Sequence, residues 1–238
     1  MISTFDISIY FQKKELLKHF TKSRIDGWMQ EAKQIYKSLV LQIPDIGGKK
    51  NGMSSFLNQS VIIMPIVIIM KKNNIPIRKI GEVIFNITAS AFSQIPMPLR
   101  WIFSARFFNK SKIQKWKKRA ERSRLRKFSE DFVFDFIEGN GFFKFGYEIT
   151  ECAICKFWRS QGLEEFVTYL CLTDWAKWRM LGINVSRSRT LANGGKSCDF
   201  RYLGRGSNAS SGWPPESVQE WTGIYETIEK DHPRSRAT

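Results

Sequence analysis

The chain has 238 residues, of which 42% are hydrophobic and 14% aromatic. This composition can fill one sizeable core and is unlike that of a disordered chain. The length favours one large domain, or one domain with a long helical extension, over two equal domains. Four cysteines are too few for a disulfide-built secreted scaffold, and the N-terminus shows no signal pattern. We therefore expect a cytoplasmic protein.

The net charge of +16 is concentrated in the N-terminal part of the chain. Residues 1–150 carry 26 basic and 12 acidic side chains, whereas residues 151–238 carry 12 and 10. The basic side chains are densest between Arg100 and Lys127. We interpret this stretch as the solvated face of a helix, because no nucleic-acid-binding motif accompanies it. A nucleic-acid partner is therefore not expected, although contact with nucleic acid or an acidic partner remains an alternative.

The N-terminal part is predicted to be helical. Apolar residues at helical spacing indicate one or two helices over 12–42, a loop at 46–52, helices over 54–72 and 77–92, and a basic helix over 110–128. The longest apolar run, Val61 to Met70, has ten residues and contains Pro65, whereas a membrane span needs about 20. We expect a buried helix or strand there and no transmembrane segment, with a membrane-touching segment as the weaker alternative.

The pattern changes after Gly139. Alternating apolar residues predict a strand over 142–149, followed by helices over 152–161 and 164–181. Strands over 184–191 and 198–203 then flank a glycine-rich hairpin loop, and a terminal helix is expected over 216–230. The predicted fold class is α+β: a helical, basic part over 1–138, then a small antiparallel sheet with an inserted helix pair over 139–238. We expect the two parts to form one compact unit.

One carboxylate falls on an apolar helix face. On a helical wheel of residues 164–181, Asp174 lies inside the arc formed by Val167, Trp175 and Trp178. A buried carboxylate must be paired, metal-bound or protonated, and desolvation raises its pKa toward the range of a general base. The alternative is a structural anchor, ion-paired to an arginine of the sheet.

The predicted hairpin supplies groups that suit an anionic substrate. In its first strand Arg187 and Arg189 share a face, and in its second Asp199 and Arg201 do. Guanidinium groups bind carboxylates bidentately. The amides of Gly194 and Gly195 would suit an anion as well, or these glycines only allow the hairpin to turn.

The four cysteines permit several interpretations. They lie at positions 152, 155, 171 and 198, so only the first pair has the tight spacing of a structural zinc site. Catalytic cysteines, a metal-ligating subset and small core residues all remain open. Cys171 lies one helical turn before Asp174 and should face the same surroundings. His19 and His232 lie in the N-terminal helix and the tail, so we do not expect a histidine-based triad.

Four blocks of sequence together carry a family resemblance. They are Phe145-Gly-Tyr-Glu-Ile-Thr-Glu-Cys152-x2-Cys155-Lys-Phe, Tyr169-Leu-Cys171-x2-Asp174, Arg189-Thr-Leu-Ala-x-Gly-Gly195-x2-Cys198-Asp-Phe-Arg201 and Gly212-Trp-Pro-Pro215. In this order they resemble the L-2-amino-thiazoline-4-carboxylic acid hydrolase family over about residues 130–215. The resemblance implies hydrolytic opening of a cyclic amidine, L-2-amino-Δ2-thiazoline-4-carboxylate, to N-carbamoyl-L-cysteine, a step in bacterial cysteine biosynthesis. It leaves open whether this chain takes that substrate or a related ring.

Joined to the residues, the implied reaction suggests roles for the site. Asp174 is the expected general base, assisted by Cys171 and Cys198, with Asp199 orienting a partner. The expected binding groups for a small substrate carrying a carboxylate are Arg187, Arg189, Thr190, Gly194, Gly195 and Arg201. The competing mechanism uses a thiolate nucleophile, or a divalent metal held by Cys152, Cys171 and Cys198. A small-molecule binding or sensing module is the alternative function, and the oligomeric state stays open.

Overall fold

The structure, a computed structural model, describes residues 4–206 and 210–226. The first six helices are α1 (Thr4–Leu16), α2 (Lys22–Val40), α3 (Ser54–Lys72), α4 (Ile77–Ser93), α5 (Met97–Phe107) and α6 (Lys110–Ser123), with a short η1 (Gly48–Lys50) before α3. Strands β1 (Val133–Glu138) and β2 (Phe145–Glu151) follow, then α7 (Ala153–Ser160), η2 (Glu164–Phe166) and α8 (Val167–Met180). The described chain ends with β3 (Ile183–Ser186), η3 (Leu191–Asn193), β4 (Cys198–Arg205) and η4 (Pro215–Ser217). This order confirms the predicted α+β class.

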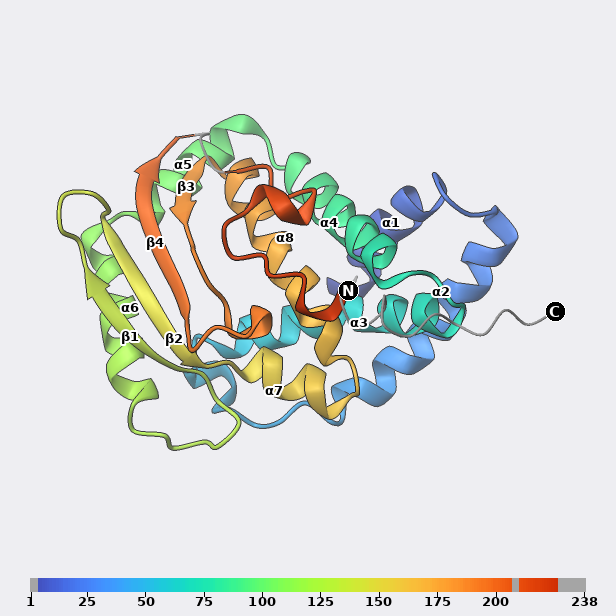
Figure 1. The fold of residues 1–238 in the computed structure, drawn as a ribbon, viewed down its shortest axis with the longest axis horizontal. Helices are drawn as coiled ribbons and strands as arrows, with labels where there is room; N and C mark the ends of the chain where they lie inside the picture. The colour runs from blue at the N-terminus through green and yellow to red at the C-terminus, as the bar shows by residue number, and fades with distance from the viewer. Residues whose placement is uncertain (1–3, 207–209, 227–238) are drawn as a thin grey trace.

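The four strands form one antiparallel sheet in the order β1-β2-β4-β3 (Figure 1). Across β2 and β4, Tyr147 pairs with Phe200 and Glu148 pairs with Asp199. Because successive side chains of a strand point to opposite faces, Tyr147 and Phe200 lie on one face and Glu148 and Asp199 on the other. We call the first the inner face, since helices cover it, and the second the outer face.

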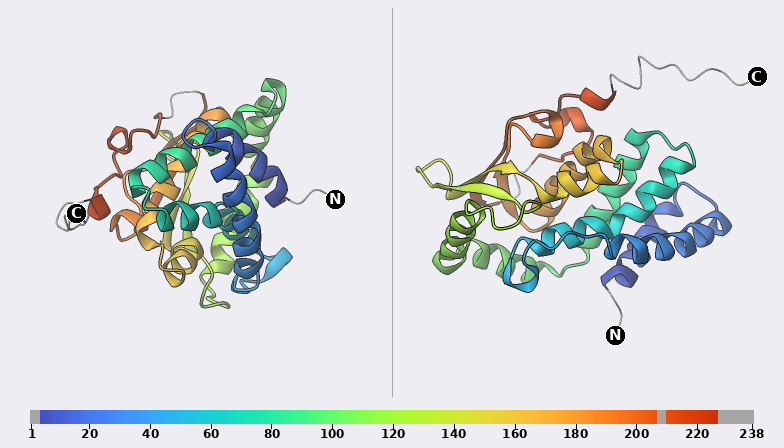
Figure 2. Two further views of the ribbon diagram at one scale, coloured as in Figure 1. Left: turned by 90° about the vertical axis from the view of Figure 1, so that its right-hand side faces the viewer. Right: turned by 90° about the horizontal axis from the view of Figure 1, so that it is seen from below.

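Aromatic side chains fill the space between the inner face and the helices. Phe145, Tyr147 and Tyr202 of the sheet contact Phe107 of α5, Trp116 of α6 and Trp178 of α8, with ring centroids 4.8–5.5 Å apart. Rings of this size bury large apolar areas and prefer tilted or edge-on contacts at such distances. Figures 1 and 2 show the sheet at one end of the molecule and α1 and α2 at the other, with α3, α4 and α8 between them.

Helix α8 packs closely against α4. A Cβ atom at Gly81 of α4 would lie 2.4 Å from a ring carbon of Tyr169 on α8, so only glycine allows the two helices to come this near. The predicted apolar arc of α8 is confirmed, because Val167, Trp175 and Trp178 are all buried. This packing fixes how far α8 reaches along the inner face and therefore where Asp174 lies.

The apolar run Val61 to Met70 belongs to α3. Among the described residues, α3 is the one helix long and apolar enough to cross a membrane by length and composition, and half of its most apolar window is buried inside the protein. Pro65 lies within α3 and is itself buried. The prediction of a buried helix is confirmed in that α3 packs against α2 and α4.

Several predicted boundaries are wrong. Residues 97–107 form α5, which was not predicted, and β1 was missed although it begins before residue 139 and pairs with β2. The predicted strand 184–191 ends at Ser186, because the next residues turn away to accept and donate hydrogen bonds with Asp199. The predicted helix 216–230 is also wrong up to residue 226, where only short turns of helix occur, and its last residues lie outside the described chain.

Candidate active site

A cavity of about 330 Å³ lies between the inner face of the sheet and helices α3, α4, α6 and α8. Its wall is mainly apolar and aromatic, including Phe56, Trp116, Phe132, Phe134, Trp178 and Phe200. The chemically active groups on that wall are Tyr147, Cys152, Cys171, Asp174, Lys177, Arg187 and Cys198. An apolar pocket with a few converging polar groups is the usual form of a small-molecule site. The predicted meeting of Asp174 with the cysteine-bearing hairpin is therefore confirmed.

Asp174 is held by two cations. Its Oδ1 accepts a hydrogen bond from Lys177 Nζ at 3.0 Å, and its Oδ2 accepts one from Arg187 Nη1 at 2.9 Å. Lys177 follows one turn later on α8, whereas Arg187 comes from the residue directly after β3. The 28% exposure of the Asp174 side chain is consistent with its place on the cavity wall. Both anchors leave lone pairs of the carboxylate free toward the cavity.

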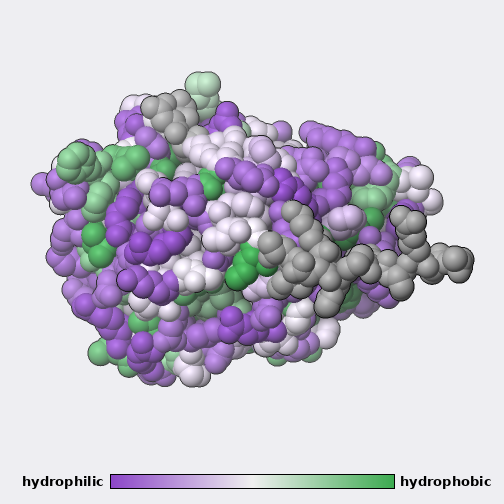
Figure 3. Space-filling model, viewed as in Figure 1, coloured by the Kyte–Doolittle hydropathy of each residue, from purple (hydrophilic) through white to green (hydrophobic). Residues whose placement is uncertain are grey.

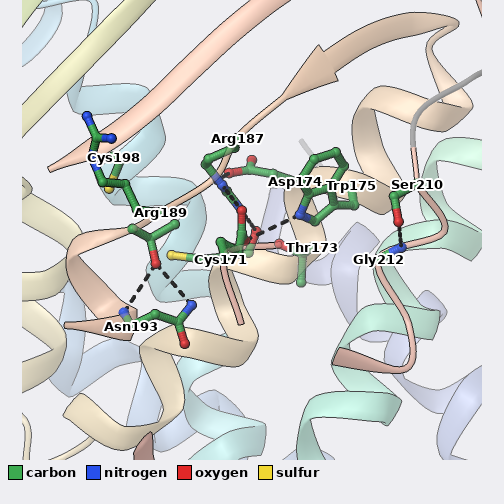
Figure 4. A network of polar contacts seen from close by, with 12 residues as sticks. Cys171, Thr173, Asp174, Trp175, Arg187, Arg189, Asn193, Cys198, Ser210 and Gly212 are labelled. Carbon is green, nitrogen blue, oxygen red and sulfur yellow. Dashed lines mark hydrogen bonds and ion pairs between the residues drawn. The ribbon is translucent and has the colours of Figure 1, made fainter. Parts of the chain in front are cut away.

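Arg187 is itself bound to a second carboxylate. Its Nε and Nη2 donate to the two oxygens of Glu220 at 2.5 Å each, and Nη2 also donates to the Cys171 carbonyl at 2.8 Å. Trp175 Nε1 donates to Glu220 as well, at 3.3 Å. Figure 4 shows Arg187, Asp174 and Trp175 grouped together, with Cys171 beside them. Because four of its five N–H groups already have partners, Arg187 acts mainly as an anchor for Asp174.

The pKa of Asp174 moves opposite to the sequence-based expectation. Burial raises the pKa of this carboxyl, but the nearby charges and hydrogen bonds of Lys177 and Arg187 outweigh that effect, so the pKa is lowered from its usual value. The carboxylate is therefore ionised throughout the neutral range. The predicted ion pair with an arginine of the hairpin is present, and Asp174 still reaches the cavity.

The cysteines divide by environment. Burial raises the pKa of Cys171 well above its usual value and that of Cys198 to about 12. A hydrogen bond from the Cys155 thiol instead lowers the pKa of Cys152. Within the described ranges, no group of three or more His, Cys, Asp or Glu side chains is arranged to hold a metal ion. The structure therefore gives no support to metal binding by Cys152, Cys171 and Cys198, and all four cysteines are free thiols.

Two donors on the cavity wall have no hydrogen-bond acceptor. The Tyr147 hydroxyl and Trp178 Nε1 are buried and make no hydrogen bond of normal geometry within the described structure. Burial is also the main reason why the pKa of Tyr147 is raised well above its usual value, so the hydroxyl keeps its proton. Unsatisfied buried donors are uncommon in native proteins. These two are suited to donate to a ligand in the cavity.

Asp199 and its neighbours lie on the outer face, away from the cavity. Asp199 accepts hydrogen bonds from the amides of Ser188 and Arg189 at 2.9 Å and from the Ser188 hydroxyl at 2.5 Å. Arg189 and Arg201 both pair with Glu148. Asp199, Arg189 and Arg201 are not part of the cavity wall described by the structure. The expected catalytic role of Asp199 and the binding roles of the two arginines are thus replaced by a role in shaping the β3–β4 loop.

The glycine-rich loop is also self-contained. Thr190 is fully buried and its hydroxyl accepts from both the amide and the side chain of Asn193, as Figure 4 shows. The Gly194 and Gly195 amides donate to the carbonyls of Leu191 and Thr190, at 3.2 and 2.9 Å. Gly194 has φ +80°, a conformation that favours glycine. The alternative that these glycines serve the turn is therefore the better one, and neither they nor Thr190 reaches the cavity.

Sequence reasoning missed several groups that the structure brings to the site. Lys177 and Trp178 were visible as the next turn of the helix carrying Asp174, and Tyr147 was placed on the inner strand face without a role. Glu220 gave no local signal, because it reaches Arg187 only through the fold of the C-terminal segment. Gly212 and Trp213 pack that segment onto the molecule: a Cβ at Gly212 would lie 2.4 Å from Trp175 Cβ.

Comparison with known proteins supports the family resemblance. Residues 102–202 match the sequence model of the family described as L-2-amino-thiazoline-4-carboxylic acid hydrolase. The matched segment runs from α5 to β4 and contains Asp174, Lys177, Arg187 and all four cysteines. No match is found for the chain among curated proteins or among solved structures. The resemblance to this family is therefore confirmed over the segment that carries most of the site.

Proposed function

We propose that this chain, similar over residues 102–202 to L-2-amino-thiazoline-4-carboxylic acid hydrolases, is a hydrolase that opens a small cyclic amidine. L-2-Amino-Δ2-thiazoline-4-carboxylate is the proposed substrate and N-carbamoyl-L-cysteine the product. The observation that carries the proposal is one ionised carboxylate, Asp174, on the wall of a mainly apolar cavity inside the matched segment. The cavity volume of about 330 Å³ lies at the lower end of the range for small-molecule pockets.

The reaction adds one water across the ring. The water oxygen bonds to C2 of the thiazoline, and the C2–sulfur bond then breaks, which leaves a carbamoyl group and a thiol. Asp174 takes the proton from the attacking water as general base and passes it to the departing sulfur. Arg187 and Lys177 hold the carboxylate in place for both steps. The anchoring hydrogen bonds also keep the carboxylate ionised, so it is available as a base at neutral pH.

Substrate binding is assigned to groups on the cavity wall. Lys177 is the cation placed to attract the substrate carboxylate, because Arg189 and Arg201 lie on the outer face. The Tyr147 hydroxyl and Trp178 Nε1 are free to donate to that carboxylate or to the developing tetrahedral carbon's substituents. The aromatic wall supplies the apolar contact for the ring carbons and sulfur.

A thiol nucleophile is the competing mechanism. In that case a cysteine sulfur bonds to C2, the ring sulfur leaves, and water then releases the carbamoyl product and restores the thiol. Cys152 is the best-suited thiol, because its pKa is lowered while those of Cys171 and Cys198 are raised. An intermediate of that mechanism would be covalently attached to the protein, and mass spectrometry of the quenched enzyme would detect it.

The test is turnover of the synthetic thiazoline by purified protein, followed by NMR so that product and substrate are seen directly. We expect N-carbamoyl-cysteine to appear with wild-type protein and its rate to fall sharply for Asp174→Asn. Related cyclic amidines with oxygen or nitrogen in place of sulfur, run in parallel, show whether the chain prefers another ring. No turnover of any of these rings, with folded protein, would overturn the proposal. We further propose a cytoplasmic location, in keeping with the free thiols.

A further inference from the structure

Helix α5 exposes an unusual share of the molecule's apolar side chains. Of the thirteen large hydrophobic residues exposed among the described residues, five lie within the seven positions from Met97 to Phe103. They are Met97, Leu99, Trp101, Ile102 and Phe103, with Trp101 61% and Phe103 46% exposed. Contiguous exposed apolar side chains of this kind mark a contact surface.

This exposure follows from how α5 is anchored. Phe107 is buried against Phe145, Trp178 and Tyr202, and Ser104 is buried on the same side of the helix. At 100° per residue, Ile102 and Trp101 point away from that side. Figure 3 shows hydrophobic surface at the upper left, where Figure 1 places α5 and the β1–β2 turn, whereas the neighbouring face is mainly hydrophilic. The core therefore holds α5 with its apolar side outward.

The charges around α5 have one sign. The chain contains no Asp or Glu between Glu82 and Glu121, and eight Lys or Arg residues lie between Arg100 and Arg119. Helix α6 follows after two residues and buries Trp116 and Ala120 against the sheet side. Its opposite side presents Lys115, Lys118 and Arg122, which are without an ion-pair partner in the described part of the chain.

The same cations border a groove. The groove has a volume of about 650 Å³ and is lined by Lys49, Lys50, Lys115, Lys118, Arg119 and Arg122, among others. Asp131 is the one acidic side chain on its described wall, and Asn51 occupies an oxygen of that carboxylate. Several cations around one groove next to an apolar helix give a site for phosphate-bearing headgroups.

We propose that α5 and α6 together form a surface that docks on an anionic lipid bilayer, with the α5 side chains entering the interface and the α6 cations contacting the headgroups. Trp, Phe, Ile, Leu and Met beside Lys and Arg are the composition of helices that lie in a membrane interface. Tryptophan in particular is enriched at that depth. The combination separates a bilayer from nucleic acid, which would be met by the cations of α6 but not by the aliphatic side chains of α5.

The experiment is vesicle flotation with the full chain. Vesicles contain phosphatidylcholine alone, or phosphatidylcholine with about one-third phosphatidylserine. We expect the protein to float with the anionic vesicles only, and raising the salt from about 0.1 M to about 1 M to weaken the interaction strongly, because the screening length falls from about 10 to about 3 Å. Equal binding to both vesicle types, or to neither, would overturn the proposal.

Paired variants locate the surface. Trp101→Ser/Phe103→Ser and Lys115→Glu/Lys118→Glu/Arg122→Glu should each lower the vesicle-bound fraction by about tenfold. Matched controls are Tyr10→Ser/Leu41→Ser, which remove exposed apolar side chains elsewhere, and Lys14→Glu/Lys33→Glu/Lys37→Glu on α1 and α2. The controls should bind like wild type. Equal loss in test and control variants would show that net charge or general hydrophobicity, and not this surface, governs binding.

Other occupants of the surface give different results. If the α5 side chains instead join two copies of the chain, light scattering shows a dimer that Trp101→Ser/Phe103→Ser converts to a monomer. If duplex DNA binds and anionic vesicles do not, the partner is a nucleic acid. Either result overturns the membrane assignment, and neither depends on thiazoline turnover, which is measured separately.

Discussion

The guanidinium of Arg187 and the carboxylate of Glu220 form a two-bond ion pair that is almost sealed from solvent, with 2% and 0% of their side chains exposed. Each bond is 2.5 Å long, and Arg187 uses a third nitrogen to hold Asp174. Removing one partner of such a pair leaves an uncompensated buried charge. The position of the proposed base therefore depends on a glutamate that lies outside the cavity.

Glu220→Gln should destabilise the fold substantially. The change leaves the shape of the side chain but removes the charge that balances Arg187, so we expect the free energy of unfolding to fall by about 3 kcal/mol or more. Urea unfolding followed by far-ultraviolet circular dichroism measures this loss. Glu216→Gln is the matched control, because its partner Arg78 is a half-exposed cation and the loss there should stay below about 1 kcal/mol. Equal losses in the two variants would contradict the buried-pair argument.

Asp174→Asn should lower turnover while the chain stays folded. Loss of a general base typically costs about 10²- to 10⁴-fold in rate. The amide keeps the size of the carboxylate, so substrate affinity should change less than kcat. Asp135→Asn, at an exposed ion pair with Arg124 on the outer part of β1, is the control and should leave turnover unchanged. Retained turnover in Asp174→Asn would remove Asp174 from the mechanism.

The pH dependence of stability should carry the signature of Asp174. Its pKa is lowered in the folded protein, so its ion pairs stabilise the fold above the unfolded pKa of about 3.9 and this contribution is lost as the pH falls through the folded value. We therefore expect no loss from this group between neutral pH and about pH 5, and a decline below about pH 4. Comparing wild type with Asp174→Asn by thermal unfolding isolates the group: the variant should show a shallower acid decline. An acid limb centred near neutral pH would contradict the lowered pKa.

Cys152 should react first with a small alkylating reagent. Its pKa is lowered, whereas burial raises the pKa of Cys171 and raises that of Cys198 to about 12. Since the thiolate is the reacting species, brief treatment with iodoacetamide at neutral pH, followed by peptide mass spectrometry, should label Cys152 ahead of the other two. Faster labelling of Cys198 would show that access, and not thiol acidity, controls reactivity in the cavity.

Gly212→Ala should destabilise the protein, because the position combines φ +76° with a Cβ that would lie 2.4 Å from Trp175 Cβ. A positive φ and an overpacked contact together are expected to cost about 2–4 kcal/mol. Gly27→Ala is the contrasting control. Gly27 lies inside α2 with nothing near the added Cβ, so alanine there should be neutral or stabilise by up to about 1 kcal/mol. Thermal unfolding of both variants gives the comparison.

Local sequence patterns predicted much of the fold because they depend on neighbours along the chain. The 3.6-residue period placed α3, α4 and α8 to within a few residues, and it placed Asp174 on the buried side of α8. Helix α5 was missed because its outward side is apolar, so it has no polar half to reveal its period. Strand β1 was missed because its alternation follows a basic helix without a strong turn signal.

The candidate site was predictable only where one element carries it. Cys171 and Asp174 share a helix, so their common cavity followed from the wheel. The assignment of Asp199 and Arg201 failed for the opposite reason: period two places them on a common face but does not say which face meets the helices. Only the pairing of Glu148 with Asp199 across β2 and β4 shows that theirs is the outer one.

Glu220 also sets when the site is completed during synthesis. The ribosome releases Asp174, Arg187 and the whole sheet before it reaches Glu220, so a nascent chain that already contains the matched segment still lacks the anion for Arg187. A protein truncated after β4 would keep the proposed base and the cysteines and yet lack the counter-charge that fixes them. The last-made stretch of the described chain thus closes the interior of the enzyme from behind.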